Sequence, residues 1–341
     1  MAAPPPHALA SVADGVIVVG ASAGGVEALV GFVRGLPDET RQAVCVVLHV
    51  SPAGTSTMPS ILGRAARLPV HSPADGDPLL SGHIYVAPPD HHLEVERGRV
   101  RLTQAPRENG HRPAIDATMR SAALAYHAAV IGFVLSGARD DGTAGLLAIK
   151  EHGGAAVVQD PAEALYSAMP RSAIDHVDVD AVLPLAEMAA WLAHRESEDP
   201  PPPGGASMPD PSTPPVGEAP RDEANGTRYT CPDCGGVIFE QQEGGMTRFR
   251  CIVGHVFSTE SLAAEQARHL EGAMWTAVRA LEDRAELLQQ MARGSGRTER
   301  PRSAGAFEGQ AADLLRRAGI VRDAIEQART GPSDEGTEAA S

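Results

Sequence analysis

Apolar residues gather in short, β-branched runs that are followed by small-residue turns and then by helical patterns. The first run is Val16–Val19, its turn spans residues 20–25, and residues 26–33 have helical spacing. Further strand patterns, alternating with helical segments, lie at residues 43–49, 129–135, 155–158 and 181–183. Continuous apolar strands of this length are typical of parallel sheets covered on both faces. Residues 14–196 are therefore predicted to form an α/β domain, a doubly wound and mostly parallel sheet.

A weaker alternation predicts one antiparallel hairpin within this domain. Residues 93–95 and 100–102 read as its strands, and Arg97-Gly98-Arg99 as its turn. The expected place for this hairpin is the edge of the otherwise parallel sheet.

The pattern changes after residue 196. Residues 197–227 are rich in proline and acidic residues and nearly lack large apolar ones, which is typical of a disordered linker. Residues 228–258 hold a small cysteine-containing module, and residues 259–330 carry two apolar stripes that predict an antiparallel helical hairpin. Residues 1–13 and 331–341 are expected to be disordered tails.

The two stripes advance by alternating steps of four and three residues. They are Leu270, Met274, Ala277, Leu281, Leu288 and Met291, and Phe307, Ala311, Leu314, Ala318, Val321, Ile325 and Ala328. The stripes either pack on each other or mediate self-association between chains.

Charge and hydropathy exclude some functions. The 341 residues include 44 acidic and 29 basic side chains, a formal net charge of −15, so nucleic acid is a poor partner. No apolar run reaches the length of a membrane span or of a signal-peptide core. We therefore expect a cytoplasmic protein without membrane insertion.

The first turn carries a candidate nucleophile. Its sequence, Gly20-Ala-Ser22-Ala-Gly24, is a G-x-S-x-G between a strand and a helix. Such a turn exposes the serine oxygen beside free N–H groups of the helix N-terminus, which can hold an oxyanion. The turn could instead cradle a phosphate, although it matches neither a dinucleotide-binding loop nor a P-loop.

A histidine and two aspartates follow the other strong strands. His49 ends the second strand, and Asp140-Asp141 follows the strand at 129–135. The carboxyl ends of parallel strands meet at one sheet edge, so these side chains could reach Ser22. Taken singly, the histidine is a structural hydrogen-bonding residue and the aspartates are helix caps. Taken together, they predict a triad with His49 as base and Asp141, beside a glycine, as the orienting acid.

The loop before the helix at residues 114–127 holds three further polar residues. His111, Arg112 and Asp116 either line a substrate cleft or act as capping and loop residues. The sequence does not decide between these two readings.

Three of the four cysteines cluster in the C-terminal half. Cys231 and Cys234 form a C-x₂-C pair, and Cys251 and His255 form a C-x₃-H pair. This spacing suits a closed, structural Zn²⁺ site in a zinc-ribbon-like module, with free thiols as the alternative. The acidic chain favours a protein contact for this module. Cys45 lies alone in a strand and reads as a small core residue.

Motifs spread over residues 14–196 resemble the catalytic domain of CheB-type protein-glutamate methylesterases of bacterial chemotaxis. They are Gly20-Ala-Ser-Ala-Gly-Gly, His49 followed by Pro52, Gly82-His-Ile-Tyr-Val-Ala-Pro, His111-Arg-Pro-Ala-Ile-Asp116, Leu135-Ser-Gly with Asp141-Gly-Thr, and Gln159-Asp with Ala168-Met-Pro. The resemblance implies that Ser22, His49 and Asp141 are nucleophile, base and orienting acid. It also implies hydrolysis of glutamate γ-methyl esters on methyl-accepting receptors, with methanol released, and often deamidation of receptor glutamines. Catalysis of this type needs no cofactor.

The chain departs from the family pattern at a few positions. Ala23 stands where the family commonly has threonine, and Gly137-Ala138-Arg139 where it commonly has Gly-Met-Gly. About a dozen residues precede the first strand, so we expect no N-terminal receiver domain and no regulation by one in cis. The alternatives are a related serine hydrolase or deamidase acting on another protein, and a non-catalytic protein-binding module.

Overall fold

A computed structural model describes residues 11–53, 56–198, 226–297 and 301–329. The chain divides into two compact units, residues 1–262 and residues 263–341. The predicted linker lies almost wholly outside the described residues, as do residues 1–10 of the first predicted tail and the whole of the second.

A seven-stranded sheet forms the centre of the first unit, in the order β3-β4-β2-β1-β7-β8-β9. Its strands are β1 (Val16–Ala21), β2 (Ala43–Leu48), β3 (Val70–His71), β4 (Ile84–Val86), β7 (Val130–Val134), β8 (Ala155–Gln159) and β9 (Ala181–Leu183). The pairing of each neighbouring couple is parallel. The predicted doubly wound α/β fold is confirmed.

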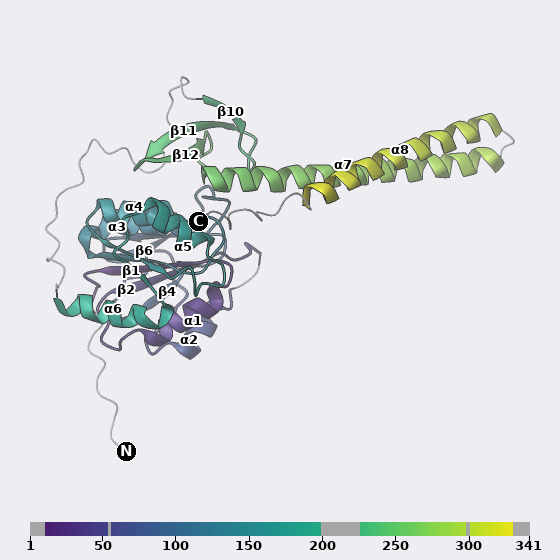
Figure 1. The fold of residues 1–341 in the computed structure, drawn as a ribbon. Helices are drawn as coiled ribbons and strands as arrows, with labels where there is room; N and C mark the ends of the chain where they lie inside the picture. The colour runs from purple at the N-terminus through teal and green to yellow at the C-terminus, as the bar shows by residue number, and fades with distance from the viewer. Residues whose placement is uncertain (1–10, 54–55, 199–225, 298–300, 330–341) are drawn as a thin grey trace, which may run out of the picture. The chain divides into compact units, whose positions relative to one another are not determined.

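Helices cover both faces of this sheet (Figure 1). On one face lie α1 (Gly25–Gly35), α2 (Met58–Ala65) and α6 (Leu185–Glu198), and on the other α3 (Ile115–Tyr126), α4 (Thr143–Glu151) and α5 (Ala168–His176). A short 3₁₀ helix, His127–Ala129, precedes β7. Alternate residues of β1 enter the two cores, which explains why the whole strand is apolar. Cys45 is fully buried in β2, and this burial raises the pKa of its thiol to about 12.

The predicted hairpin exists, but it is not the edge of the large sheet. Strands β5 (His92–Glu96) and β6 (Arg99–Thr103) form a separate two-stranded sheet. Side chains of α3 satisfy the backbone of β5, because Thr118 Oγ1 donates to Leu93 O (2.7 Å) and Ser121 Oγ accepts from Val95 N (3.0 Å). A helix, and not a neighbouring strand, therefore holds the hairpin.

Residues 12 and 13, before the predicted boundary at residue 14, already contact the domain. Ala13 is buried, and its amide donates to Leu79 O at 2.9 Å. Val12 also forms an isolated antiparallel bridge with Leu80.

The cysteine-containing module is a four-stranded antiparallel sheet in the order β10-β11-β12-β13. Its strands are β10 (Gly226–Thr230), β11 (Val237–Glu243), β12 (Met246–Cys251) and β13 (Val256–Ser258). Gly244 and Gly245, both at positive φ, form the turn that joins β11 to β12. A small core of Ile238, Phe249, Phe257 and Leu262 surrounds two of the cysteines.

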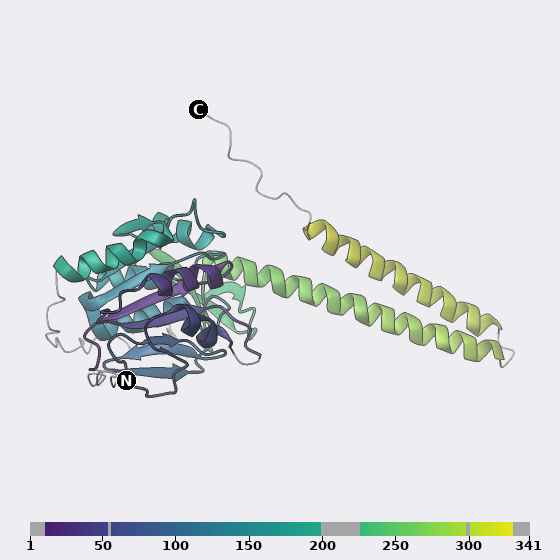
Figure 2. The same ribbon diagram turned by 90° about the horizontal axis from the view of Figure 1, so that it is seen from below.

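The C-terminal segment is a pair of long helices, α7 (Thr259–Arg297) and α8 (Pro301–Arg329). They lie side by side in both views, drawn in green and yellow (Figures 1 and 2). Val278 packs with Ala318 and Ile325, and Glu282 pairs with Arg322 across the two helices. The helices thus pack on each other, as the first of the two readings predicted.

The frame of the stripe on α7 differs from the predicted one. The buried positions are Val278, Ala285 and Ala292, with Met274 and Leu281 beside them. Leu270, Ala277 and Met291 are exposed, contrary to prediction. On α8 the buried residues Ala311, Ala318 and Ile325 match the predicted stripe. Both buried sets repeat every seven residues, which is the spacing of a coiled-coil seam.

None of the helices in the described part of the chain is both long and apolar enough to cross a membrane.

Candidate active site and metal centre

Ser22 follows the last residue of β1, in the turn that leads into α1. Gly24, the N-cap of α1, has φ +67°, a conformation that glycine adopts without strain. The turn is fixed from outside, because Ser22 N donates to Ser136 O (3.0 Å) and Ser136 Oγ donates to Ala23 O (2.8 Å). The serine hydroxyl is thereby held at the carboxyl edge of the sheet.

Ser22, His49 and Asp141 form one hydrogen-bonded series. His49 Nδ1 lies 2.9 Å from Ser22 Oγ, and His49 Nε2 lies 2.6 Å from Asp141 Oδ2. An ionised carboxylate only accepts, so Nε2 carries the proton and Nδ1 is free to accept from the serine hydroxyl. The three residues come from the ends of β1, β2 and β7, which are adjacent in the sheet.

Asp141 is 2% exposed and is surrounded by donors. Its Oδ2 accepts from Ile115 N (2.8 Å), and its Oδ1 accepts from Asp116 N (3.2 Å) and from Asn109 Nδ2 (2.9 Å). Ile115 and Asp116 are the first residues of α3, so the carboxylate sits at a helix N-terminus, where negative charge is favoured. The hydrogen bond and charge of His49, together with these donors, overcome burial and keep the pKa of Asp141 well below its usual range.

A glycine makes this approach of α3 to the sheet edge feasible. A Cβ atom on Gly20 of β1 would lie 2.3 Å from Ile115 Cγ2. A larger residue at position 20 would therefore collide with the side chain of Ile115, the first residue of the helix whose first amides bind Asp141.

The structure separates the two neighbouring aspartates as predicted. Asp141 points to His49, while Asp140 accepts a hydrogen bond from Ser261 Oγ at 2.8 Å. Only Asp141 is therefore in a position to orient the histidine.

The three polar residues predicted around the start of α3 make different contacts in the structure. His111 stacks on His49, with ring centroids 3.6 Å apart and an interplanar angle of 5°. Arg112 pairs with Asp90 at 2.7 Å, away from the triad. Asp116 is fully buried and accepts from Gly142 N (2.9 Å) and Gly145 N (2.7 Å) at the start of α4. One residue therefore touches the triad, one is a loop residue, and one caps a helix.

Sequence reasoning missed the residues that support the triad. Asn109 donates from one side-chain nitrogen to both Asp116 (2.9 Å) and Asp141 (2.9 Å). Gln159 Oε1 accepts from Ser136 N (2.9 Å) and so holds the residue that supports the turn carrying Ser22. Asn109 begins an Asn-Gly pair with φ +53°, a signal that reads simply as a turn.

Two further carboxylates lie buried near Asp141. Burial and the Asp141 charge raise the pKa of Asp116 to about 7, against the opposing effect of Arg248. Burial also acts to raise the pKa of Glu108, but its ion pairs with Arg120 and Arg248 lower it to about 2.

A cavity of about 410 Å³ opens beside Ser22 and His49. Its lining is mixed: Val50, Met58 and Pro89 are apolar, and Glu27 and several hydroxyl groups are polar. The Glu27 carboxylate disfavours an anion, so the cavity suits an uncharged group next to the serine.

At the family departure, Ala138 is exposed and Arg139 has φ +64°. This φ lies in the left-handed region, which glycine adopts without strain, and this explains why the family commonly has glycine at position 139.

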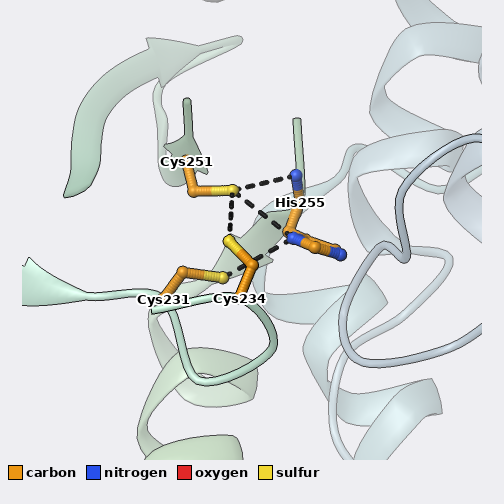
Figure 3. A group of neighbouring side chains, drawn as sticks. All are labelled: Cys231, Cys234, Cys251 and His255. Atoms are coloured by element: carbon orange, nitrogen blue, oxygen red, sulfur yellow. Dashed lines mark hydrogen bonds between the residues drawn. The ribbon is translucent and has the colours of Figure 1, made fainter. Parts of the chain in front are cut away.

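The cysteine and histidine side chains converge at one point of the small module (Figure 3). Cys234 Sγ lies 3.6 Å from Cys251 Sγ, and His255 Nδ1 lies 3.4 Å from Cys251 Sγ and 3.7 Å from Cys231 Sγ. A tetrahedral zinc, with bonds of about 2.3 Å to sulfur and about 2.05 Å to nitrogen, separates two sulfurs by about 3.8 Å and sulfur from nitrogen by about 3.6 Å. The four residues therefore fit a metal of this size and geometry.

Two backbone knuckles present these ligands. Gly235 N donates to Cys231 O (2.8 Å), and Gly254 N donates to Cys251 O (2.9 Å), so each pair lies on a tight turn. Asp233 Oδ2 lies 3.9 Å from His255 Nε2, on the side of the ring away from the sulfurs. A carboxylate in that position favours the tautomer in which Nδ1 binds metal.

Known proteins are similar to the N-terminal half of this chain. Residues 17–192, just over half of the chain, match the family model described as CheB methylesterase. A Pseudomonas aeruginosa protein named protein-glutamate methylesterase/protein-glutamine glutaminase 2 is 40% identical over 181 residues, 52% of each chain. A Leptospira interrogans protein, named a putative enzyme of the same kind, is 37% identical over 51% of this chain and 90% of its own length.

A solved structure agrees with these relatives. The CheB methylesterase catalytic domain of Thermotoga maritima is similar with a TM-score of 0.51 and 31% identity, over 53% of this chain and 98% of that one. The chain spans about half the length of the Pseudomonas relative, and the match to each of these proteins is confined to about half of this chain. With a family model over half its length and a relative covered almost throughout, this chain belongs to the CheB methylesterase family.

Proposed function

We propose that this protein is a serine hydrolase that demethylates glutamate γ-methyl esters in a protein substrate, with Ser22 as nucleophile, His49 as base and Asp141 as orienting acid. The observation that carries the proposal is the hydrogen-bonded series from Ser22 Oγ through His49 to Asp141, with distances of 2.9 and 2.6 Å. The names of the relatives support the choice of ester.

In the first step His49 Nδ1 takes the hydroxyl proton as Ser22 Oγ attacks the ester carbonyl. Asp141 accepts from His49 Nε2–H and stabilises the imidazolium that forms. Collapse of the tetrahedral intermediate breaks the bond to the methoxy oxygen, which leaves as methanol with the proton from His49. The product of this half-reaction is a glutamyl ester of Ser22.

In the second step water attacks that ester while His49 again accepts a proton. The proton then passes to Ser22 Oγ, and glutamate is released. Amide groups in the first turn of α1 have no partner within the helix, so they are the natural donors to the oxyanion of both intermediates.

The cavity beside Ser22 supports a small neutral group as the reacting end of the substrate. A glutamate methyl ester has this character, and so does the carboxamide of glutamine, which would release ammonia instead of methanol. The relatives' names also include protein-glutamine glutaminase, which favours deamidation as a second activity. Methyl-accepting chemotaxis receptors, met in the cytoplasm, are the substrates we propose.

We also propose that Cys231, Cys234, Cys251 and His255 bind one structural Zn²⁺. Four protein ligands fill a tetrahedral site, so this metal would take no part in the ester chemistry. The metal would stabilise the fold of the module, because the hydrophobic core of the module consists of only a few side chains.

The decisive test of the esterase is methanol release from receptor membranes carrying labelled methyl groups. We expect release with the wild-type protein and background release with Ser22→Ala, a change that removes one oxygen. Ser51→Ala, which alters another serine lining the same cavity, is the matched control. Wild-type protein that is folded and releases no methanol would contradict the proposal.

A further inference from the structure

An arginine from the cysteine-containing module lies inside the catalytic domain. Arg248 is on β12, and its side chain is only 1% exposed. Its Nη2 donates to Glu108 Oε1 at 2.5 Å, and its Nη1 lies 3.2 Å from Asp116 Oδ2, off the hydrogen-bond axis. A buried arginine of this kind is costly unless it has a defined carboxylate partner.

A short path connects this arginine to the triad. Asp116, which faces Arg248, shares the Asn109 side-chain nitrogen with Asp141, at 2.9 Å on each side. Asp141 in turn holds His49 at 2.6 Å. Arg248 therefore stands two residues away from the orienting acid, without touching it.

The module also fixes Asn109 itself. Asn109 N donates to Val256 O at 2.7 Å, and Asn109 Oδ1 accepts from Ser258 N at 3.1 Å. Both partners lie on β13, next to the strand that carries Arg248. The side-chain nitrogen is thus aimed at the two aspartates because the oxygen is bound to the module.

The charges in this region explain why the arginine is needed. Glu108 is already paired through both oxygens with Arg120, at 2.7 and 2.6 Å. Asp116 and Asp141 are both buried, and Arg248 is the guanidinium that lies within ion-pair distance of Asp116 among the described residues. The remaining ionisable neighbours are His49 and His111 beside Asp141, and Glu243, whose Oε2 is 3.9 Å from Arg248 Nε. His92 and Arg250 also lie within electrostatic range of Glu108.

We propose that Arg248 is a positioning residue for the triad, through which the C-terminal module sets the charge and orientation of Asp141. The cation balances Asp116, so that Asn109 and the first amides of α3 can hold Asp141 as an ionised acceptor for His49. Esterase activity therefore depends on a contact that the CheB-like half of the chain cannot make by itself. The inference deepens the proposed function and uses the same triad.

The experiment compares full-length wild type, Arg248→Gln, Arg248→Lys and Arg101→Gln. Arg101 is exposed on β6 and pairs with Glu96, outside the buried cluster, so it is the control for loss of one arginine. Two readouts are used across pH. One is kcat/KM for methanol release, and the other is the rate at which a fluorophosphonate probe labels Ser22, which needs the triad and not the natural ester.

We expect Arg248→Gln to slow both reactions about tenfold near neutral pH, equivalent to about 1.4 kcal/mol of barrier. Loss of the cation favours protonated forms of the cluster, so the low-pH limb of both profiles should move to higher pH. Arg248→Lys keeps the charge and should restore the low-pH limb and part of the rate, and Arg101→Gln should behave as wild type.

A second variant separates this role from a loss of folding. Asn109→Ala interrupts the path without changing the charge, and we expect it to slow labelling of Ser22. In a double-mutant cycle, Asn109→Ala and Arg248→Gln should be non-additive, because they act in one series. If Arg248→Gln does not fold, Arg248→Lys takes its place in the cycle, and the part of the rate that lysine does not restore should again be non-additive with Asn109→Ala.

The proposal would be overturned if Arg248→Gln slowed both reactions equally at every pH and Arg248→Lys restored neither. It would also be overturned if the effects of Asn109→Ala and Arg248→Gln were additive. Failure of the proposed function looks different: the wild type would label at Ser22 and release no methanol. The comparison of labelling rates among the variants would then still decide the role of Arg248.

Discussion

The imidazole rings of His49 and His111 lie face to face, 3.6 Å apart between centroids and within 5° of parallel. His111 thus covers one face of the proposed catalytic base. We expect His111→Ala to lower kcat for methanol release about tenfold, because His49 loses a surface that limits its rotation. His111→Phe keeps a flat ring and should retain most of the activity. A phenylalanine variant as slow as the alanine variant would contradict a stacking role.

Replacement of Asp141 by asparagine should be far more harmful than its size suggests. The amide can donate to His49 and so favours the tautomer that cannot accept from Ser22. We expect kcat to fall by about 10⁴-fold, with the fold retained. Asp140→Asn is the matched control, because Asp140 bonds to Ser261 and not to His49, and it should change kcat by no more than about threefold. Equal losses in the two variants would exclude the assigned orienting role.

The Glu108 ion pairs should make stability depend on pH in the acid range. The pKa of Glu108 is lowered from 4.5 to about 2, so its contribution is present above pH 4.5 and is lost as pH falls towards 2. A shift of this size is worth about 3 kcal/mol. Urea unfolding of wild type and Glu108→Gln should therefore differ most above pH 4.5 and converge towards pH 2. Glu96→Gln, at a surface ion pair, should show no such convergence.

Metal content should follow the cluster in the small module. We expect about one zinc per chain in wild type and a marked loss in Cys251→Ser, measured by mass spectrometry of the metal. Cys45→Ala removes a cysteine that is buried in the sheet and should leave the metal content unchanged. Zinc retained at the wild-type level in Cys251→Ser would rule out the proposed site.

Arg139 carries a backbone strain that glycine would relieve. Its φ of +64° disfavours any side chain with a Cβ atom. We expect Arg139→Gly to raise the free energy of unfolding by about 1 kcal/mol, measured in urea. Ala138→Gly, at the neighbouring exposed position, is the control and should not stabilise. A loss of stability in Arg139→Gly would show that contacts of the arginine side chain outweigh the strain.

The sequence was sufficient for five of the seven strands of the main sheet because their signals are local. Val16–Val19, the glycine turn and the helix after it lie within twenty residues. Strands β3 and β4 were not predicted, because they have only two and three residues and no helix lies between them. The choice of Asp141 over Asp140 also rested on a neighbour in sequence, and the structure directs Asp141 to His49. The hairpin was misplaced because its partner is a helix, bound through Thr118 and Ser121, and not a strand.

Other features depend on residues that are far apart or weakly hydrophobic. The ion pair between Glu108 and Arg248 spans 140 positions, so neither residue carries a local signal for it. On α7 the stripe was set one residue off at Met291 because the buried position, Ala292, is small and its neighbour is large. Alanine in a seam contributes close packing but little hydrophobicity, so a pattern of larger residues does not reveal it. At Ala277 the buried neighbour is Val278, and size does not explain that error.

The origin of the triad in three neighbouring strands has a consequence for how the protein reaches activity. Ser22 and His49 are 27 residues apart in the chain, and His49 and Asp141 are 92 apart. Parallel pairings over such separations close large loops and form slowly. Recovery of esterase activity during refolding should therefore trail the recovery of helical signal and coincide with completion of the central sheet. If the proposed activity is measured during refolding, its recovery should therefore report the formation of the slowest long-range contacts.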